Sequence, residues 1–349
     1  MPVVSFMPYF PNERVNRTVG RFSLWNWWNF REQLVEEGEL RNFLDRYFGL
    51  YVRSDGQTEP RITVLAVDGL GAFPEEADLP KEDVARFTSA LMACHLFCLP
   101  SQSNAGWMAC SSDNFIAFYH SFNPSGQNPG VAFVFGSYVK LGVFGSWDYL
   151  RFTTPQYMPT STLACSCEES LLANLAAIAG DQSEQVERIF RSFDWLGLAF
   201  ANYDGLEYRS RVVSMATAFE TLLDLPEKFK GQCFSETVNS LLPPNNLPIA
   251  RRVGGRRGRQ ISDNKVGWWC REFYDLRSKI VHGEQVSPGE LSYNGGAAHL
   301  RIALSVFEEC LRGLFVRMGR MTGHERLIGF VFRRAWRDYL NVPDNVWCM

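Results

Sequence analysis

Arg277 and His282 are the two residues of this chain whose types and spacing are best suited to chemistry. They lie five residues apart in the run Asp275–Gly283, which reads DLRSKIVHG. A neutral His can take the proton of an RNA 2′-OH, and a protonated His can give one to the leaving 5′-oxygen. The guanidinium of Arg is always charged and fits a phosphate, so it can stabilise a pentacoordinate transition state. The pair is therefore sufficient for RNA cleavage without a metal.

These two side chains must be positioned by the helix that the sequence predicts over Lys265 to His282. Gly283 is a natural residue to end that helix, because glycine readily adopts the left-handed conformation at the C′ position. On a regular helix, residues five apart are separated by about 140° around the axis. Arg277 and His282 therefore meet either through a distortion near Gly283 or through a second copy of the helix.

The segment FYDLRSKIVHGE, from Phe273 to Glu284, resembles the R-x4-6-H motif of HEPN domains, and most closely the ApeA-like branch of that superfamily. The resemblance covers about residues 184–320. It implies a small all-helical bundle that acts as a homodimer, in which two protomers join their motifs in one composite cleft. The implied activity is that of a metal-independent endoribonuclease without a cofactor, which leaves a 2′,3′-cyclic phosphate or 3′-phosphate and a 5′-OH. ApeA-like proteins are associated with bacterial defence against phage through abortive RNA cleavage, so a toxin-like role in antiviral defence is also implied.

Two positions depart from the motif that this resemblance would lead one to expect. Many HEPN motifs have Asn, Asp or His directly after the Arg, where this chain has Ser278. Ser278 can still donate a hydrogen bond to phosphate, so we expect it to support the catalytic pair. Glu284 stands where one toxin–antitoxin class has a Tyr that partner nucleotidyltransferases modify. That difference argues against such regulation.

Glu220 is an acidic residue within the otherwise apolar segment Ala218–Leu223. One interpretation is an exposed position at the edge of a helix. The other is that its carboxylate reaches Arg277 or His282 and orients it, as a carboxylate orients a catalytic His elsewhere. HEPN-like bundles often carry an acidic residue in an early helix, so Glu220 is a candidate supporting residue.

A basic segment directly precedes the motif helix, and it contains five arginines in nine residues: Arg251, Arg252, Arg256, Arg257 and Arg259. With Lys279, these side chains could follow the phosphates of RNA. A solvated linker, or a contact to an acidic partner or to the acidic N-terminal part of the chain, explains the same composition.

Three further fragments carry residues that often serve in sites. The run Cys94-His95-Leu96-Phe97-Cys98 has no second Cys/His pair at matching spacing, and Cys165-Ser166-Cys167 is equally weak, so no metal site is predicted. Three Trp within Trp25–Trp28 could stack on bases or a small ligand. Burial in an N-terminal core is the favoured interpretation of that aromatic cluster.

Hydrophobic periodicity divides the chain at about residue 180. Strand-like alternation occurs in residues 61–67, 114–119, 131–135 and 138–144, and a helix is predicted over 81–99. Apolar residues at three-and-four spacing then predict five consecutive helices, over 184–203, 211–225, 232–242, 265–282 and 299–318. The predicted fold is an α+β N-terminal domain (1–175) followed by an all-α HEPN-like helical bundle (181–320) and a C-terminal tail (321–349).

The composition favours a folded cytoplasmic protein. The 349 residues are 46% hydrophobic and 21% charged, and no apolar stretch approaches the roughly 20 residues of a membrane span. The N-terminus has no signal-peptide pattern, and nine scattered cysteines suit reduced thiols. Residues 1–180 carry a net charge of −6, whereas residues 181–349 carry +3, so a phosphate-binding surface is expected in the second half.

These observations together predict a metal-independent endoribonuclease with RNA as substrate, a homodimeric state, and Arg277 and His282 as catalytic residues. The N-terminal domain would then sense a phage-derived or cellular trigger, because such a nuclease must be held silent until infection. The alternative is a catalytically silent HEPN scaffold that dimerises and binds RNA or protein. A metal-dependent enzyme in the N-terminal domain is disfavoured, since no His/Asp/Glu cluster occurs there.

Overall fold

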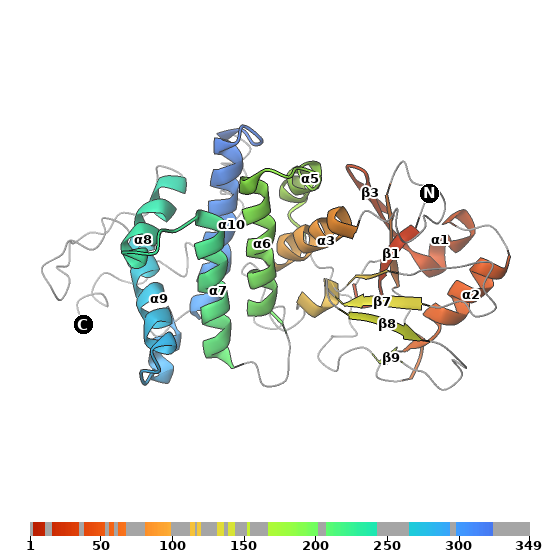
Figure 1. The fold of residues 1–349 in the computed structure, drawn as a ribbon, viewed down its shortest axis with the longest axis horizontal. Helices are drawn as coiled ribbons and strands as arrows, with labels where there is room; N and C mark the ends of the chain where they lie inside the picture. The colour runs from red at the N-terminus through yellow and green to blue at the C-terminus, as the bar shows by residue number, and fades with distance from the viewer. Residues whose placement is uncertain are drawn as a thin grey trace, which may run out of the picture. The chain divides into compact units, whose positions relative to one another are not determined.

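A computed structural model describes most of the chain (Figure 1). The described residues are 3–10, 16–34, 38–52, 56–58, 62–67, 81–98, 112–115, 117–119, 131–135, 139–143, 152–153, 167–201, 207–242, 265–293 and 298–323. Within them, no helix combines the length and the apolar character needed to cross a membrane.

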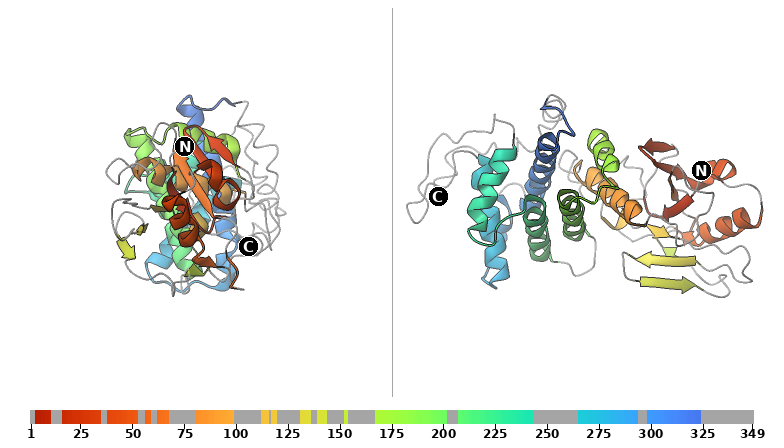
Figure 2. Two further views of the ribbon diagram at one scale, coloured as in Figure 1. Left: turned by 90° about the vertical axis from the view of Figure 1, so that its right-hand side faces the viewer. Right: turned by 45° about the horizontal axis from the view of Figure 1, so that its top comes forward.

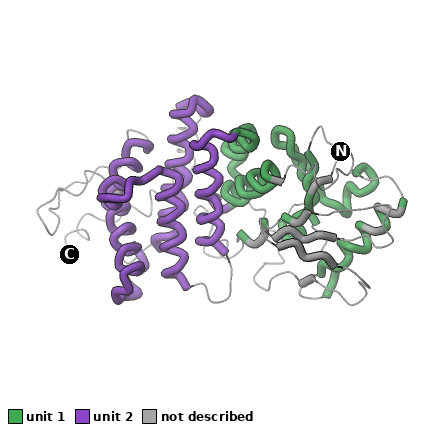
Figure 3. Tube along the Cα trace, viewed as in Figure 1, with its two compact units in different colours: residues 1–95, 108–181 green, residues 96–107, 182–349 purple. Residues whose placement is uncertain are grey.

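The chain divides into two compact units, shown in different colours in Figure 3. Unit 1 comprises residues 1–95 and 108–181, and unit 2 comprises residues 96–107 and 182–349. Unit 1 contains a small sheet with helices, and unit 2 is mostly helical. The expected succession of an α+β part and a helical part is therefore confirmed at this level.

Unit 1 is organised by a five-stranded antiparallel sheet in the order β2-β3-β5-β1-β6. Its strands are β1 (Val3–Met7), β2 (Arg17–Val19), β3 (Phe22–Asn26), β5 (Thr63–Val67) and β6 (Phe118–Tyr119). The predicted strand over 61–67 is thus confirmed as the central β5. The strand predicted over 114–119 is wrong in its first half, where Ser112–Phe115 forms a 3-10 turn. Two further pairs are β4 (Tyr51–Val52) with β9 (Phe152–Thr153), and β7 (Val131–Phe135) with β8 (Val139–Val143).

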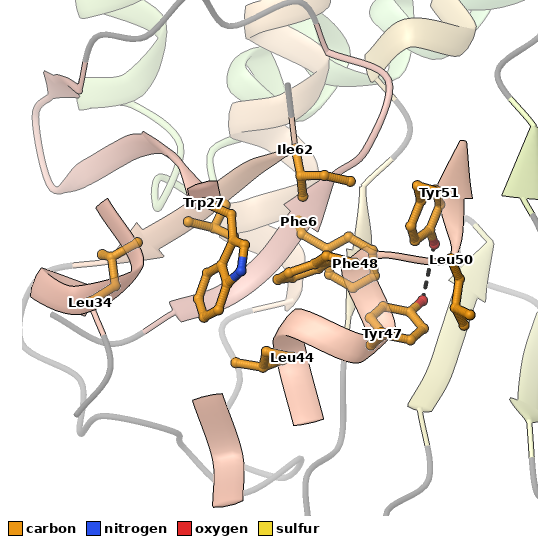
Figure 4. Packing of buried hydrophobic residues seen from close by; sticks show 10 residues of the cluster. Phe6, Trp27, Leu34, Leu44, Tyr47, Phe48, Leu50, Tyr51 and Ile62 are labelled. Carbon is orange, nitrogen blue, oxygen red and sulfur yellow. Dashed lines mark hydrogen bonds between the residues drawn. The ribbon is translucent and has the colours of Figure 1, made fainter. Parts of the chain in front are cut away.

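The helices of unit 1 are α1 (Trp27–Leu34), α2 (Glu39–Phe48), α3 (Lys81–Leu96) and α5 (Glu169–Ala177). Side chains from α1, α2 and the sheet form an aromatic core, in which Phe6 meets the rings of Tyr47 and Phe48 edge to face (Figure 4). Trp27 is fully buried in this core and donates through Nε1 to Asp45 at 2.8 Å. The core interpretation of the tryptophan cluster is therefore confirmed at Trp27.

Unit 2 contains the five helices that the apolar periodicity predicts. They are α6 (Glu184–Ala199), α7 (Tyr208–Leu223), α8 (Lys230–Leu241), α9 (Lys265–Val281) and α10 (His299–Arg317). Helix α6 packs along α7, α8 packs along α9, and α10 contacts both α7 and α8. Figures 1 and 2 show α6 and α7 side by side.

Phe219 on α7 lies at the centre of the bundle. Its ring centroid is 4.9 Å from that of Phe234 on α8, 6.3 Å from that of Phe273 on α9 and 5.2 Å from that of Phe307 on α10. One buried ring thus contacts three other helices, and such aromatic pairs contribute about 0.5–1.5 kcal/mol each beyond their buried area. Its neighbour in sequence, Glu220, is consequently held at the rim of this core.

A close approach of α10 to the end of α8 gives a first prediction. Gly313→Ala should lower the free energy of unfolding by about 1–2 kcal/mol, because the new methyl carbon would lie 2.6 Å from the Leu241 carbonyl oxygen. The loss is net of the roughly 1 kcal/mol that Ala gains over Gly in a helix. Urea unfolding followed by circular dichroism measures it. Gly180→Ala is the control, since a Cβ there meets nothing within 4 Å; equal midpoints for the two variants would contradict the prediction.

Candidate functional site

The C-terminal end of α9 carries the predicted catalytic motif. Gly283 adopts a φ of +71°, and its N–H donates to the Ile280 carbonyl at 3.1 Å. The Glu284 N–H donates to the Lys279 carbonyl at 2.9 Å. This pair of bonds is the Schellman pattern, in which a left-handed C′ residue satisfies the last carbonyls of a helix. The prediction that Gly283 ends the helix is confirmed.

The helix is still regular where it reaches His282. The His282 N–H donates to the Ser278 carbonyl at 3.0 Å, which is the ordinary bond of an α-helix to the fourth preceding residue. The left-handed turn follows only at Gly283. Arg277 and His282 therefore keep a separation of about 140° around the axis. The turn at Gly283 does not bring these two positions to one face of the helix.

Arg277 is held by a carboxylate from another helix. Its Nη2 lies 3.3 Å from Glu220 Oε1, and the side chains are only 22% and 14% exposed. The same carboxylate accepts from the Tyr274 hydroxyl at 2.8 Å and from Lys230 Nζ at 2.7 Å. The Arg277 guanidinium also lies over the Tyr274 ring, 5.6 Å from its centroid. Glu220 thus reaches Arg277, as one of its two interpretations required, through a cluster contributed by α7, α8 and α9.

The pKa of the Tyr274 hydroxyl is set by its burial and by the charges of this cluster. Burial raises the pKa of its hydroxyl well above the ordinary value, and the hydrogen bond to Glu220 raises it further, while Arg277 acts in the opposite direction. The phenol therefore remains a hydrogen-bond donor to Glu220 at neutral pH.

His282 is exposed at the end of α9. The side chain of Val281 beside it is also 50% exposed. Neither residue packs into the core of the bundle, so an imidazole at this position is accessible to a large substrate or to another protein chain.

One face of α9 and the start of α8 line a groove of about 940 Å³. Ser278 and Lys279 lie in its wall. Lys279 forms an ion pair with Glu290, and this pair together with hydrogen bonds from Ser287 lowers the pKa of the Glu290 carboxyl to about 2. The charged side chains of the lining are Lys230, Arg271, Lys279, Glu272, Asp275, Glu284 and Glu290. Acidic groups outnumber basic ones by four to three, and this balance does not favour a phosphate backbone along the whole groove.

An acid–base pair that the sequence did not reveal lies at this groove. Glu272 Oε1 is 3.7 Å from Nε2 of His299, and His299 is fully buried. Burial raises the pKa of Glu272 to about 7, with a further contribution from the charge of Asp275. Burial also lowers the pKa of His299 to about 4. Both groups are thus driven toward their neutral forms, as desolvation requires.

The remaining residues that the sequence predicts to bind RNA lie outside the part of the chain that the structure describes. The five arginines between Arg251 and Arg259 lie outside the described residues, and so does the tail from residue 324 onward. Within the part of the chain that is described, no group of three His, Cys, Asp or Glu side chains could hold a metal ion. The expected contribution of the five arginines to RNA binding therefore stays a prediction.

Comparison with known proteins adds no relative to this picture. No protein-family model matches the chain, and no curated protein or solved structure gives a significant match.

The shifted pKa of Glu272 gives a second prediction. Folded Glu272 keeps its proton up to about pH 7, whereas the unfolded carboxyl loses it near 4.5. Its stabilising contribution is therefore complete below pH 4.5 and is lost as the pH rises through 7. Glu272→Gln should gain stability relative to the wild type between pH 5 and pH 8. The gain should reach about 1 kcal/mol, because the side chain is partly exposed and screened.

Urea unfolding of the wild type and of Glu272→Gln at pH 5 and pH 8 measures this difference in stability. The control is Glu284→Gln, which removes an exposed acid of the same groove. A pH-independent difference for Glu272→Gln, or an equal one for Glu284→Gln, would contradict the assignment.

Proposed function

We propose that unit 2 is an HEPN-like bundle that cleaves RNA without a metal, as a homodimer with Arg277 and His282 as catalytic residues. The proposal rests on one observation above the others: Arg277 is fixed by Glu220, while His282 stands exposed one and a half turns further along the same helix. The order of the five helices and the resemblance of the motif support it.

Each side chain has a distinct part in this chemistry. His282 takes the proton of a 2′-OH or gives one to the leaving 5′-oxygen. Arg277 stabilises the charge that develops on the phosphate. The Arg277 side chain is 22% exposed, and a phosphate oxygen is a suitable acceptor for the N–H groups of its guanidinium. Ser278 can add a neutral hydrogen bond beside it.

The third prediction concerns cleavage of total RNA and tRNA by the purified protein in EDTA. Wild type should produce fragments with 2′,3′-cyclic phosphate ends, and His282→Ala and Arg277→Ala should each lose activity by about 100-fold or more. The products are resolved on denaturing gels and their ends identified by mass spectrometry.

Arg320→Ala is the matched control, because it removes an exposed arginine outside the motif. Cleavage by all variants would indicate a contaminant or another site and would contradict the assignment. Circular dichroism of Arg277→Ala separates a loss of catalysis from a loss of fold.

The fourth prediction concerns the composite cleft. Arg277→Ala and His282→Ala chains, co-expressed with different tags and purified as a mixed dimer, should recover about half of the wild-type activity. One intact Arg/His combination then arises from the two defective copies. Recovery is measured with the same RNA assay, and the two separately purified homodimers serve as controls. No recovery in a verified mixed dimer would show that Arg277 and His282 act within one chain.

The silent scaffold is the second candidate, and the ion pair favours it to a degree, because Glu220 already neutralises Arg277 within the chain. A scaffold would dimerise and bind RNA equally well with either substitution. The proposed role in defence requires more than cleavage in vitro: growth arrest on co-expression, during phage infection, should depend on His282.

A further inference from the structure

Cys167 is surrounded by groups that favour a thiolate. It lies just before α5, is partly exposed, and accepts a hydrogen bond from Arg17 Nη2 on β2 at 3.3 Å from its Sγ. The same nitrogen forms an ion pair with Glu169. All of these residues belong to unit 1, so the site is separate from the motif on α9.

The end of α3 supplies two more neighbours. The Glu168 N–H donates to the Cys94 carbonyl at 3.2 Å, so the backbones at Cys167 and Cys94 run beside each other. The side chains of Cys94 and His95 both lower the pKa of the Cys167 thiol. Cys94 is fully buried, whereas Cys167 can be reached from solvent.

The combined effect is a low pKa for the Cys167 thiol. The hydrogen bond from Cys94 is the largest contribution, burial opposes it, and His95 and Arg17 lower the pKa further, to about 4. A cysteine beside cationic groups is predominantly thiolate at neutral pH, and thiolates are the species that react with electrophiles.

Metal binding does not explain this cluster. The described residues contain no group of three His, Cys, Asp or Glu that could hold a metal, and an arginine in contact with the sulfur repels a cation. The fragments around Cys94 and Cys167 are weak as metal motifs. The fold instead places the two cysteines beside each other, Cys94 buried and Cys167 partly exposed.

We propose that Cys167 is a peroxide-reactive thiolate and that the buried Cys94 is the thiol that resolves its oxidised form into a disulfide. The Cys167 sulfur attacks one oxygen of a hydroperoxide, the O–O bond breaks, and the departing oxygen takes a proton from water. Cys167 is then a sulfenic acid. The Cys94 sulfur attacks the sulfur of Cys167, the S–O bond breaks, and the oxygen leaves as water with the proton of Cys94. Two thiols are oxidised and one hydroperoxide is reduced by two electrons.

The arrangement fits the roles of the two residues. Arg17 and His95 stabilise the attacking thiolate, and the partial exposure of Cys167 lets a small peroxide reach it first. Cys94 lies directly behind it, where a second oxidation by solvent peroxide is hindered by burial. A disulfide here would join α3 to the segment that begins α5.

The test uses the full chain, reduced and then treated with hydrogen peroxide, followed by peptide mass spectrometry. Wild type should form a Cys94–Cys167 disulfide. Cys94→Ser should stop at a sulfenic acid on Cys167 that dimedone traps, and Cys167→Ser should form no disulfide at Cys94. A disulfide of Cys167 with another cysteine would overturn the role of Cys94, and an unmodified Cys167 would overturn the proposal.

The pH profile of alkylation by iodoacetamide separates a true thiolate from an ordinary thiol. Between pH 5.5 and 7.5, the rate at an ordinary cysteine rises about 100-fold, whereas the rate at Cys167 should change less than about two-fold. Cys233 is the internal control, since it is also partly exposed but donates to the Lys228 carbonyl. Arg17→Gln, which removes the positive charge beside the sulfur, should restore part of the ordinary pH dependence. A profile at Cys167 parallel to that of Cys233 would overturn the proposal.

Discussion

The carboxylate of Glu220 is the interaction on which the arrangement at α9 depends. It lies beside Phe219, whose ring is enclosed by α8, α9 and α10, so the acid is fixed at the rim of the core and only 14% exposed. A charge in such a place is costly unless donors surround it. Lys230, Tyr274 and Arg277 supply those donors from two other helices. Burial of the phenylalanine thus dictates where the arginine of the motif is held.

Arg277 and His282 consequently differ in the conformational freedom of their side chains. Arg277 is restrained by an ion pair and by the Tyr274 ring, whereas His282 ends the helix in solvent with its backbone fixed by the turn at Gly283. Because the helix is regular between them, their separation of about 140° is a property of the backbone rather than of the side chains. In the proposed nuclease, this separation is the reason for pairing Arg277 of one chain with His282 of a second copy.

The sequence predicts well whatever depends on local periodicity. Helices α6 to α10 begin and end within a few residues of the predicted ranges, since each buries one apolar face, and Gly283 ends α9 as glycine chemistry requires. The secondary structure of the aromatic run near Trp27 was harder to predict, because strand β3 ends at Asn26 and helix α1 begins at Trp27. Contacts between distant residues were out of reach: Tyr274 and Glu220 are 54 positions apart, and nothing in a single sequence indicates that Glu272 lies beside His299.

The surplus of donors around Glu220 bears on how an ion pair and phosphate binding can coexist. If Arg277 were the single partner of a buried carboxylate, turning it toward a phosphate would leave that charge unpaired at a cost of several kcal/mol. Lys230 and Tyr274 remain in place when Arg277 moves, so the loss is closer to that of one hydrogen bond among three, about 1–3 kcal/mol. Charge-assisted hydrogen bonds between the Arg277 guanidinium and a phosphate offset a free-energy loss of that order. In the proposed nuclease, the cluster can therefore hold Arg277 in position before RNA binds without preventing the movement of Arg277 to the phosphate.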